Sequence, residues 1–464
     1  MNQSVKNPMQ NNLPLFIRKN LFKVVVLFCG LINQESRAQS SYFPPLIGKT
    51  WTSTAPSNFG WCQDRIDSLY QYLGNHNSKA FILLIDGKIV LEKYFGTFTQ
   101  DSIWYWASAG KTLTGFCLGI AQQEGSLKIT EPSNKYLGKG WTSLSQTQED
   151  SITIRHHLSM TTGLDDGVSD PNCTDPNCLK YKADAGKRWA YHNAPYTLLD
   201  KVIESATGNT LNQFVYQKIT KITGIQGLFY KSGYLNVFAS TPRSFARFGL
   251  LLLNKGNWNG NKIILDTQYY YDQTNSSQSI NPSYGYLTWL NGKSSYMLPQ
   301  VQFQFSGSIC DDAPSDMFAA LGKNGQIINV VPSKNMVWIR MGNAPDTSPA
   351  GAISVSLNND IWKYLNQMSC SSMIEKTQPD IVPIQFSPNP IHANDGIEIS
   401  SILQSIIHQE AIKIKAIDLS TGRSISCPIN GTIINTQSLQ SGVYYFQIED
   451  KNTVITKQKV IVLP

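Results

Sequence analysis

The sequence lacks two common zinc-binding motifs and a complete phosphate-binding loop. It contains neither an HExxH motif nor a pair of CxxC motifs, which argues against a catalytic metal. Gly110-Lys111-Thr112 matches the end of a phosphate-binding loop, but that loop needs a glycine five residues before Gly110, where this chain has Tyr105. We therefore expect no metal and no cofactor, so that side chains must carry any chemistry.

The chain also carries little charge. Charged residues make up only 15% of the sequence, and the formal net charge is +7. The first 38 residues hold five cationic residues and one glutamate, so they supply +4 of this charge and leave +3 for the remainder. Such a small charge over so long a chain is no footprint for nucleic acid. The 41% hydrophobic content is typical of a globular protein with a large core.

Long apolar runs are scarce. The run from Val24 to Ile32 follows a basic stretch that ends at Lys23, and it is too short to span a bilayer comfortably. Small residues around Ala38 offer a cleavage site, so residues 1–38 are predicted to be an export signal. A lipoprotein signal through Cys29 is the alternative, although Phe28 stands where a small residue is expected. No other segment suggests a membrane anchor.

The cysteines are few but informative. Seven of the eight follow the predicted signal, which fits an oxidising compartment. Cys173 and Cys178 lie in a turn-rich loop, where a local disulfide is plausible. Cys62 and Cys370 flank the ends of the large part of the chain and are a second candidate pair, and Cys117 is expected to pack inside its helix. Spacing alone leaves the connectivity open.

Composition divides the chain into two folded parts. Residues 41–370 mix helical and strand patterns, residues 371–380 form a polar linker, and residues 381–464 hold short alternating segments typical of a small β-sandwich. In the first part, a hairpin at Asp86-Gly87 joins two strands over 81–94. Helices are expected over 108–124, 195–206, 241–254 and 352–367, and further strands over 325–331 and 335–341. The prediction is an α/β (α+β) fold, with helices flanking an antiparallel sheet and a helical region inserted.

Ser108-Ala109-Gly110-Lys111 is the most informative short motif. A serine and a lysine three residues apart share one face of a helix, so the amine can reach the hydroxyl. A partly desolvated lysine supplies the base that a serine nucleophile needs. In the first turn of a helix, free backbone N–H groups and the helix dipole also favour developing negative charge. The motif arises often by chance, so its weight depends on the residues downstream.

Tyr191-His192-Asn193 follows roughly eighty residues after Lys111, just before a helical pattern. A tyrosine near such a serine and lysine can act as a proton shuttle, which takes the serine proton and returns it to the leaving group. Its phenol is too weak a base unless a nearby cation lowers its pKa, which is a role we expect of Lys111. The Tyr-x-Asn spacing is weak by itself, because it recurs at Tyr234 and at Tyr364.

Five stretches together resemble the serine β-lactamase-related family, which includes class C β-lactamases, DD-peptidases, carboxylesterases and 6-aminohexanoate-dimer hydrolases. They occur in the family's order at 106–115, 152–164, 189–196, 243–253 and 318–332. The resemblance implies a β-lactamase/transpeptidase-like fold. It also implies that Ser108 is an acyl-enzyme nucleophile and Lys111 its activator. Tyr191 would be the general base and then acid, and Asn193 a supporting polar group.

A third family element departs from the usual Lys-Thr-Gly or His-Thr-Gly triplet. Residues 318–326 instead read Phe-Ala-Ala-Leu-Gly-Lys-Asn-Gly-Gln, which is similar to the glycine-rich forms of the esterase and aminohexanoate-hydrolase branches. We expect this strand to supply the second backbone N–H of an oxyanion hole, beside that of Ser108, without assigning it to one residue. The substrate-binding candidates on the strand are Gly322, Lys323, Asn324 and Gly325.

The missing triplet weakens recognition of the carboxylate that penicillins and peptidoglycan stems carry. The sequence therefore predicts a hydrolase for esters or small amides. The alternatives are a β-lactamase or DD-peptidase, and a non-catalytic penicillin-binding-like surface scaffold.

Several other polar residues have less specific interpretations. His156 and His157 are expected to pack or to cap a helix, whereas His192 either points away from the site or lines it. Trp289 either lines the substrate cleft or fills the core. Four aspartates are interpreted as residues of Asx turns rather than as calcium ligands, namely Asp165, Asp166, Asp170 and Asp175.

The tail carries a resemblance of its own. Motifs at 386–390, 417–423 and 439–445, followed by a terminal lysine-bearing strand, are similar to a type IX secretion C-terminal sorting domain. The resemblance implies a Bacteroidota-type bacterium, the type IX secretion machinery as a partner, and a secreted or cell-surface location. A carbohydrate-binding β-sandwich is the alternative.

Overall fold

The computed structural model describes residues 41–345 and 353–370, and in the tail residues 386–387, 391–392, 396–399, 412–419, 422–430, 433–450 and 453–463. The predicted signal (1–38) and linker (371–380) lie outside the described residues. Within the described ranges, no helix has the length and apolar character that crossing a bilayer requires.

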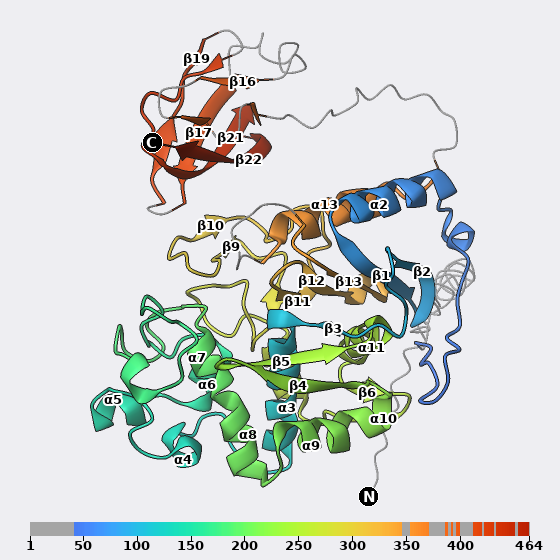
Figure 1. Cartoon of the computed structure of the whole chain (residues 1–464), viewed down its shortest axis with the longest axis vertical. Helices are drawn as coiled ribbons and strands as arrows, with labels where there is room; N and C mark the ends of the chain where they lie inside the picture. Colours follow the sequence, from blue (N-terminus) through green and yellow to red (C-terminus); the bar gives the residue numbers. More distant parts are fainter. Residues whose placement is uncertain are drawn as a thin grey trace, which may run out of the picture. The chain divides into compact units, whose positions relative to one another are not determined.

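A six-stranded antiparallel sheet lies at the centre of the first part (Figure 1). Its order is β2-β1-β13-β12-β11-β8, so β1, near the start of the domain, pairs with β13, near its end. Asp86 and Gly87 both have positive φ and join β1 to β2, which confirms the predicted hairpin. The bounds are β1 (Ser78–Ile85), β2 (Lys88–Tyr94), β8 (Trp289–Leu290), β11 (Phe318–Gly322), β12 (Gln326–Val331) and β13 (Met336–Gly342).

Helices cover both faces of this sheet (Figure 1). α11 (Pro242–Leu253) packs on one face against β1, β12 and β13, whereas α2 (Gln63–Asn75) and α13 (Val355–Asn366) lie together on the other. Gly249 permits the close approach of α11, because a Cβ at this position would lie 2.5 Å from the Val337 side chain. The predicted disulfide between Cys62 and Cys370 forms and closes a very long loop, which constrains the unfolded chain.

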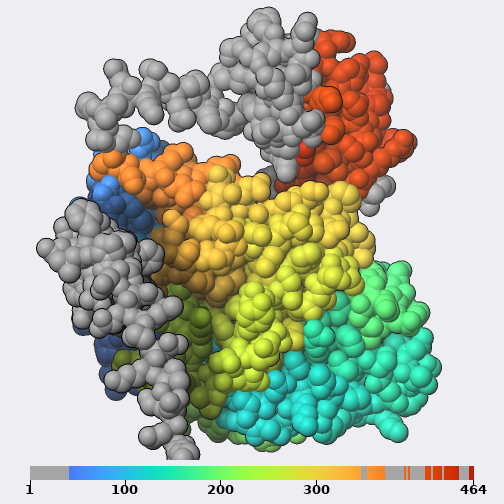
Figure 2. All heavy atoms as spheres, turned by 180° about the vertical axis from the view of Figure 1, so that it is seen from behind, coloured from blue at the N-terminus to red at the C-terminus, as the bar shows by residue number. Residues whose placement is uncertain are grey.

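The remaining helices form the inserted helical region and its surroundings, and Figure 2 shows the cyan and green segments gathered at one end of this part. The bounds are α3 (Gly110–Gln123), α4 (Asn134–Leu137), α5 (Gln146–Asp150), α6 (Ile154–Leu158), α7 (Asn193–Thr197), α8 (Leu199–Thr207), α9 (Leu211–Val215), α10 (Lys221–Thr223) and α12 (Thr267–Gln273). A small sheet, β3-β5-β4, comprises β3 (Trp104–Tyr105), β5 (Leu235–Ser240) and β4 (Gly227–Ser232). The short pairs are β6 (Asn257–Trp258) with β7 (Asn261–Lys262), and β9 (Ser295–Tyr296) with β10 (Phe305–Ser306).

Two predicted helices differ from the observed ones. The helix expected over 108–124 begins at Gly110, because residues Ala107–Ala109 form a separate 3-10 turn, η2. The helix expected over 195–206 is divided into α7 and α8, with a break at Leu198. Both differences lie beside candidate site residues.

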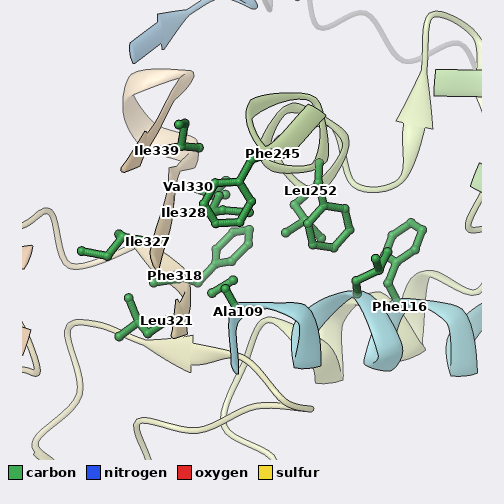
Figure 3. Close-up of a cluster of buried hydrophobic side chains, with 14 of the residues drawn as sticks. Ala109, Phe116, Phe245, Leu252, Phe318, Leu321, Ile327, Ile328, Val330 and Ile339 are labelled. Carbon is green, nitrogen blue, oxygen red and sulfur yellow. The ribbon is translucent and has the colours of Figure 1, made fainter. Parts of the chain in front are cut away.

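α3 is a core helix, since all residues from Gly110 to Ala121 are buried. A helix buried on every side is held by the packing around it rather than by an exposed polar face. Figure 3 shows Ala109, at its start, in the same apolar cluster as Phe318 of β11 and Phe245 of α11. The residue that follows Ser108 is thus anchored in the core of the domain.

The tail contains two further sheets with a core of their own. Buried side chains such as Ile414, Phe446 and Val460 form that core, as expected of a small β-sandwich. One sheet has the order β14-β16-β20-β19 and the other β15-β22-β21-β17-β18. The bounds are β14 (Phe386–Ser387), β15 (Ile391–His392), β16 (Ile397–Ile399), β17 (Ile412–Asp418), β18 (Ser424–Ser426), β19 (Ile429–Asn430), β20 (Ile433–Ile434), β21 (Gly442–Asp450) and β22 (Thr453–Leu463).

Candidate active site

Ser108 lies in the 3-10 turn η2, between the small sheet and α3. Ala107, the residue before it, has a positive φ of 48°, which is a strained conformation for a non-glycine residue. The fully buried Trp106 holds the turn, since its indole Nε1 donates to Ser240 Oγ at 2.7 Å and its backbone N–H donates to the Phe238 carbonyl at 2.8 Å. The packed core therefore maintains the strained presentation of Ser108.

Lys111 points from the first turn of α3 to this serine. Its Nζ lies 3.0 Å from Ser108 Oγ, and the side chain is buried, with only 4% of the residue exposed. Burial lowers the pKa of Lys111 from 10.5 to about 7, an effect that the carboxyl group of Asp200 partly opposes. The amine lies over the rings of Tyr196 and Tyr191, at 4.2 and 5.1 Å from their centroids. Near neutral pH a large fraction of Lys111 is the free amine, which can accept the serine proton.

Asp200 is a site residue that the sequence analysis missed. It lies on α8 and is almost fully buried; its Oδ2 accepts a hydrogen bond from Asn236 Nδ2 at 2.8 Å. Burial, more than any other effect, raises the pKa of this carboxyl to about 7. Asp200 borders the apolar face that Leu199 and Ile203 form on an amphipathic helix, a position that the sequence pattern alone does not distinguish from the exposed face.

Tyr191 stands beside the serine and the lysine. Its ring stacks on Trp289 with centroids 5.8 Å apart, and Trp289 is buried, so this tryptophan packs behind Tyr191 rather than forming an exposed wall of the cleft. Burial raises the pKa of the Tyr191 phenol, and an interaction with the Ser108 hydroxyl opposes this only in part. No hydrogen bond of standard geometry satisfies the phenol within the described residues.

The expectation that Lys111 lowers the pKa of Tyr191 is therefore wrong. Burial lowers the pKa of Lys111 and raises the pKa of Tyr191, so it favours the neutral form of both groups. The lysine is therefore only partly a cation, and its amine lies over the face of the tyrosine ring. Tyr191 is a neutral phenol at physiological pH and carries a proton that it can donate.

Asn193 and His192 follow Tyr191 in sequence, but neither makes a hydrogen bond to Ser108 or Lys111 among the described residues. Asn193 Nδ2 donates to Asn172 Oδ1 at 2.8 Å, and no hydrogen bond among the described residues joins Asn193 to Ser108 or Lys111. His192 is 2% exposed and thus too buried to line an open cleft; burial lowers its pKa to about 4, so it is neutral.

The glycine-rich strand does lie beside the nucleophile. A Cβ on Gly322, the last residue of β11, would lie 2.5 Å from the Trp106 carbonyl oxygen and 3.1 Å from the Ser108 nitrogen, so only glycine fits there. The Lys323 side chain is exposed. Asn324 Nδ2 donates to the Tyr105 hydroxyl at 2.7 Å, and Gly325 has a φ of 69°, so both belong to the turn between β11 and β12.

The loop before Tyr191 is closed by the predicted disulfide between Cys173 and Cys178. The Asx turns expected at Asp165 and Asp170 form, with their side chains accepting the backbone N–H two residues later. The other two aspartates differ from that expectation. Asp166 pairs with Arg188 at 2.6 Å, and Asp175 accepts a hydrogen bond from Tyr234.

The histidine and cysteine predictions outside the site are confirmed. His156 takes part in the capping box of α6 with Thr153. His157 is buried and bonded to Ser133 and to the carbonyl of Pro195. Cys117 is a buried free thiol.

This geometry brings together a serine that follows a strained residue, a lysine that can lose its proton, and a phenol that keeps its proton. A family model described as Beta-lactamase matches residues 67–354. An uncharacterized protein of Alkalihalophilus pseudofirmus is 26% identical over 306 residues, which cover 58% of this chain and 84% of that protein.

Two solved structures resemble the fold. A provisionally assigned 6-aminohexanoate-dimer hydrolase from Bacillus anthracis has a TM-score of 0.52 at 20% identity, covering 71% of this chain and 90% of that one. A provisionally assigned beta-lactamase from Bacteroides dorei has a TM-score of 0.51 at 15% identity, covering 66% and 99%.

Proposed function

The chain belongs to the beta-lactamase family of serine hydrolases, and we propose that it cleaves an ester or a small amide through an acyl-enzyme on Ser108. The contact of 3.0 Å between Lys111 Nζ and Ser108 Oγ, inside a site that lowers the pKa of the lysine to about 7, carries this proposal. A base with a pKa near the working pH is the most effective one for proton transfer.

In the proposed mechanism, Lys111 Nζ takes the Ser108 proton as Oγ attacks the carbonyl carbon of the substrate. The resulting oxyanion accepts hydrogen bonds from the Ser108 N–H and from a backbone N–H at the end of β11. Tyr191 donates its phenolic proton to the leaving group, and the Lys111 ammonium replaces that proton. Water then releases the acyl group by the same steps in reverse.

Residues 320–322 support an ester or a small amide as substrate. They read Ala-Leu-Gly, so this strand presents neither a cationic nor a hydroxyl side chain to a substrate carboxylate. A β-lactamase or DD-peptidase activity is the second candidate, because the exposed cation of Lys323 stands next to Gly322 and can pair with such a carboxylate.

A fluorophosphonate probe tests the proposed nucleophile. We expect the wild-type protein and a Ser57→Ala control, altered at an exposed serine, to be labelled, and Ser108→Ala to remain unlabelled. Labelling of Ser108→Ala would contradict the mechanism. A folded wild-type protein without any labelling would favour the non-catalytic scaffold.

A substrate panel separates the candidate activities. p-Nitrophenyl esters and D-amino-acid amides should be cleaved faster than nitrocefin. Rapid nitrocefin turnover that Lys323→Ala abolishes would transfer the assignment to the second candidate.

The proposal extends to location. We propose export by residues 1–38 and passage through the outer membrane by a type IX sorting domain over 381–464. Two disulfides fit an oxidising compartment, and the tail has its own β-sheet core. Removing residues 381–464 should keep the enzyme inside the cells, and undiminished release of the shortened chain would exclude this route.

A further inference from the structure

Arg340, on β13, is a buried cation that the mechanism above does not use. The residue is 0% exposed, and within the described residues no carboxylate forms an ion pair with it. A guanidinium has five N–H donors, and all five are used here. Nε donates to Ser78 Oγ at 3.0 Å, Nη2 donates to the carbonyls of His76 (2.6 Å) and Asn343 (3.2 Å), and Nη1 donates to those of Asn324 (2.7 Å) and Gly325 (2.9 Å).

These five acceptors belong to two kinds of structure. Ser78 begins β1 and His76 caps the end of α2, so the Nε contact and one Nη2 contact attach Arg340 to the start of an inner strand of the sheet, and Asn343, just after β13, accepts the other Nη2 contact. The two Nη1 contacts instead hold the turn between β11 and β12. A Cβ on Gly325 would lie 2.5 Å from Nη1, so this glycine lets the guanidinium approach the turn directly.

The same turn lies next to the segment that carries Ser108. Gly322, one residue before it, lies against the backbone of Trp106 and Ser108, and Asn324 bonds to the hydroxyl of Tyr105. Any shift of the turn would separate two guanidinium N–H groups from their carbonyls inside the core, where water cannot replace them. The turn is therefore held in one position with respect to Ser108.

The charge of Arg340 persists under working conditions. Burial lowers the pKa of the guanidinium to about 9, which still leaves it protonated at neutral pH. Among the described residues, four carbonyls and the Ser78 hydroxyl accept hydrogen bonds from this guanidinium, and no carboxylate pairs with it, so the geometry of these bonds is more demanding than that of an ion pair on the surface.

We propose that Arg340 is a positioning residue of the hydrolytic site, which holds the β11–β12 turn so that the backbone N–H at the end of β11 meets the substrate oxyanion beside Ser108. This inference rests on the proposed function. It differs from a purely structural role because it predicts an effect on the transition state in a protein that is still folded.

Arg340→Lys tests the proposal, because it keeps the charge and removes two of the five donors. Arg247→Lys is the matched control, since Arg247 is also buried and donates to carbonyls, those of Thr223 and Pro45, without touching the turn. With p-nitrophenyl acetate, we expect kcat of Arg340→Lys to fall by about 10²-fold while KM stays within about threefold. The rate of fluorophosphonate labelling should fall in parallel, and Arg247→Lys should keep the wild-type kcat.

A folded Arg340→Lys protein with the kcat of the wild type would overturn the proposal, and so would equal losses in kcat for both arginine variants. If Arg340→Lys does not fold, Ser78→Ala decides, because it removes one contact of Arg340 on the side away from the turn. A severalfold loss of kcat at constant KM supports the proposal, and an unchanged kcat overturns it. A wild-type protein that neither turns over esters nor reacts with the probe refutes the proposed function itself.

Discussion

Lys111 and Arg340 are two buried basic residues whose surroundings differ. Within the described residues, the Lys111 amine makes one hydrogen bond, to Ser108, and it lies over the rings of Tyr196 and Tyr191. Arg340 makes five hydrogen bonds and keeps its charge. A buried basic group with few hydrogen bonds can exchange protons near neutral pH, whereas one whose donors are all hydrogen-bonded keeps its charge and fixes the position of its partners.

The largest expected effect comes from removing the unsatisfied cation. Lys111→Met should lower kcat/KM by about 10³-fold or more, since general-base catalysis contributes up to about 10⁴. The same change should raise the midpoint of thermal unfolding, because methionine suits an apolar site better than an amine does. Lys201→Met, at an exposed position on α8, is the control for both measurements. A loss of stability in Lys111→Met would show that Lys111 also stabilises the fold, and it would remove the contrast with Arg340.

Gly322→Ala should lower kcat by about 10²-fold, because its Cβ would displace β11 from the Trp106 carbonyl and the Ser108 nitrogen. Gly74→Ala, where the nearest atoms to a Cβ lie at 3.6 Å, should leave activity unchanged. Steady-state kinetics on matched preparations measure both variants. An active Gly322→Ala enzyme would mean that the close approach of β11 is unnecessary for catalysis.

Of the two basic residues, only Lys111 should titrate in the pH dependence of kcat/KM. The base acts as a free amine, so kcat/KM should rise with pH and reach a plateau above about 7, with about a tenfold loss for each unit below it. Stability should change in the same direction. The pKa of Lys111 is lower in the folded than in the unfolded chain, so unfolding takes up a proton between about pH 7 and 10.5, and its contribution to the free energy of unfolding rises with pH across this window. A flat rate profile between pH 5 and 7 would exclude Lys111 as the base.

The smallest expected effect concerns Asp200. Its carboxyl group raises the pKa of Lys111, so Asp200→Asn should move the acid limb of the kcat/KM profile to lower pH by a fraction of a unit. Asparagine retains an acceptor for Asn236. Asp64→Asn, at an exposed position on α2, should leave the limb in place, and a shift to higher pH in Asp200→Asn would contradict this account of the electrostatics.

Local sequence patterns predicted much of the secondary structure around the site. The hairpin at Asp86-Gly87 depends only on two residues that tolerate positive φ, and α11 depends on the apolar periodicity of one segment, so both agree with the structure. The spacing of Ser108 and Lys111 likewise predicted that amine and hydroxyl can meet. The limits of α3 were less accurate, because the buried Trp106 and the strain at Ala107, rather than helix propensity, decide where the helix begins.

The errors have a common physical cause. The pKa of Tyr191 was predicted to fall and instead rises. The sequence suggests that Lys111 lies near this phenol, but it does not show how deeply the two groups are buried. Asp200 and Arg340 were missed because each acts across large separations in sequence, and neither belongs to a motif.

The amino-acid sequence was sufficient to identify the chemical groups of this protein, the spacing that brings Lys111 to Ser108, and the family to which the chain belongs. The protonation states and hydrogen-bond partners of these groups, including the five bonds of Arg340 and the partial neutrality of Lys111, follow from the tertiary structure. Both properties depend on desolvation and on hydrogen bonds between segments far apart along the chain, and these exist only when the core has closed around them.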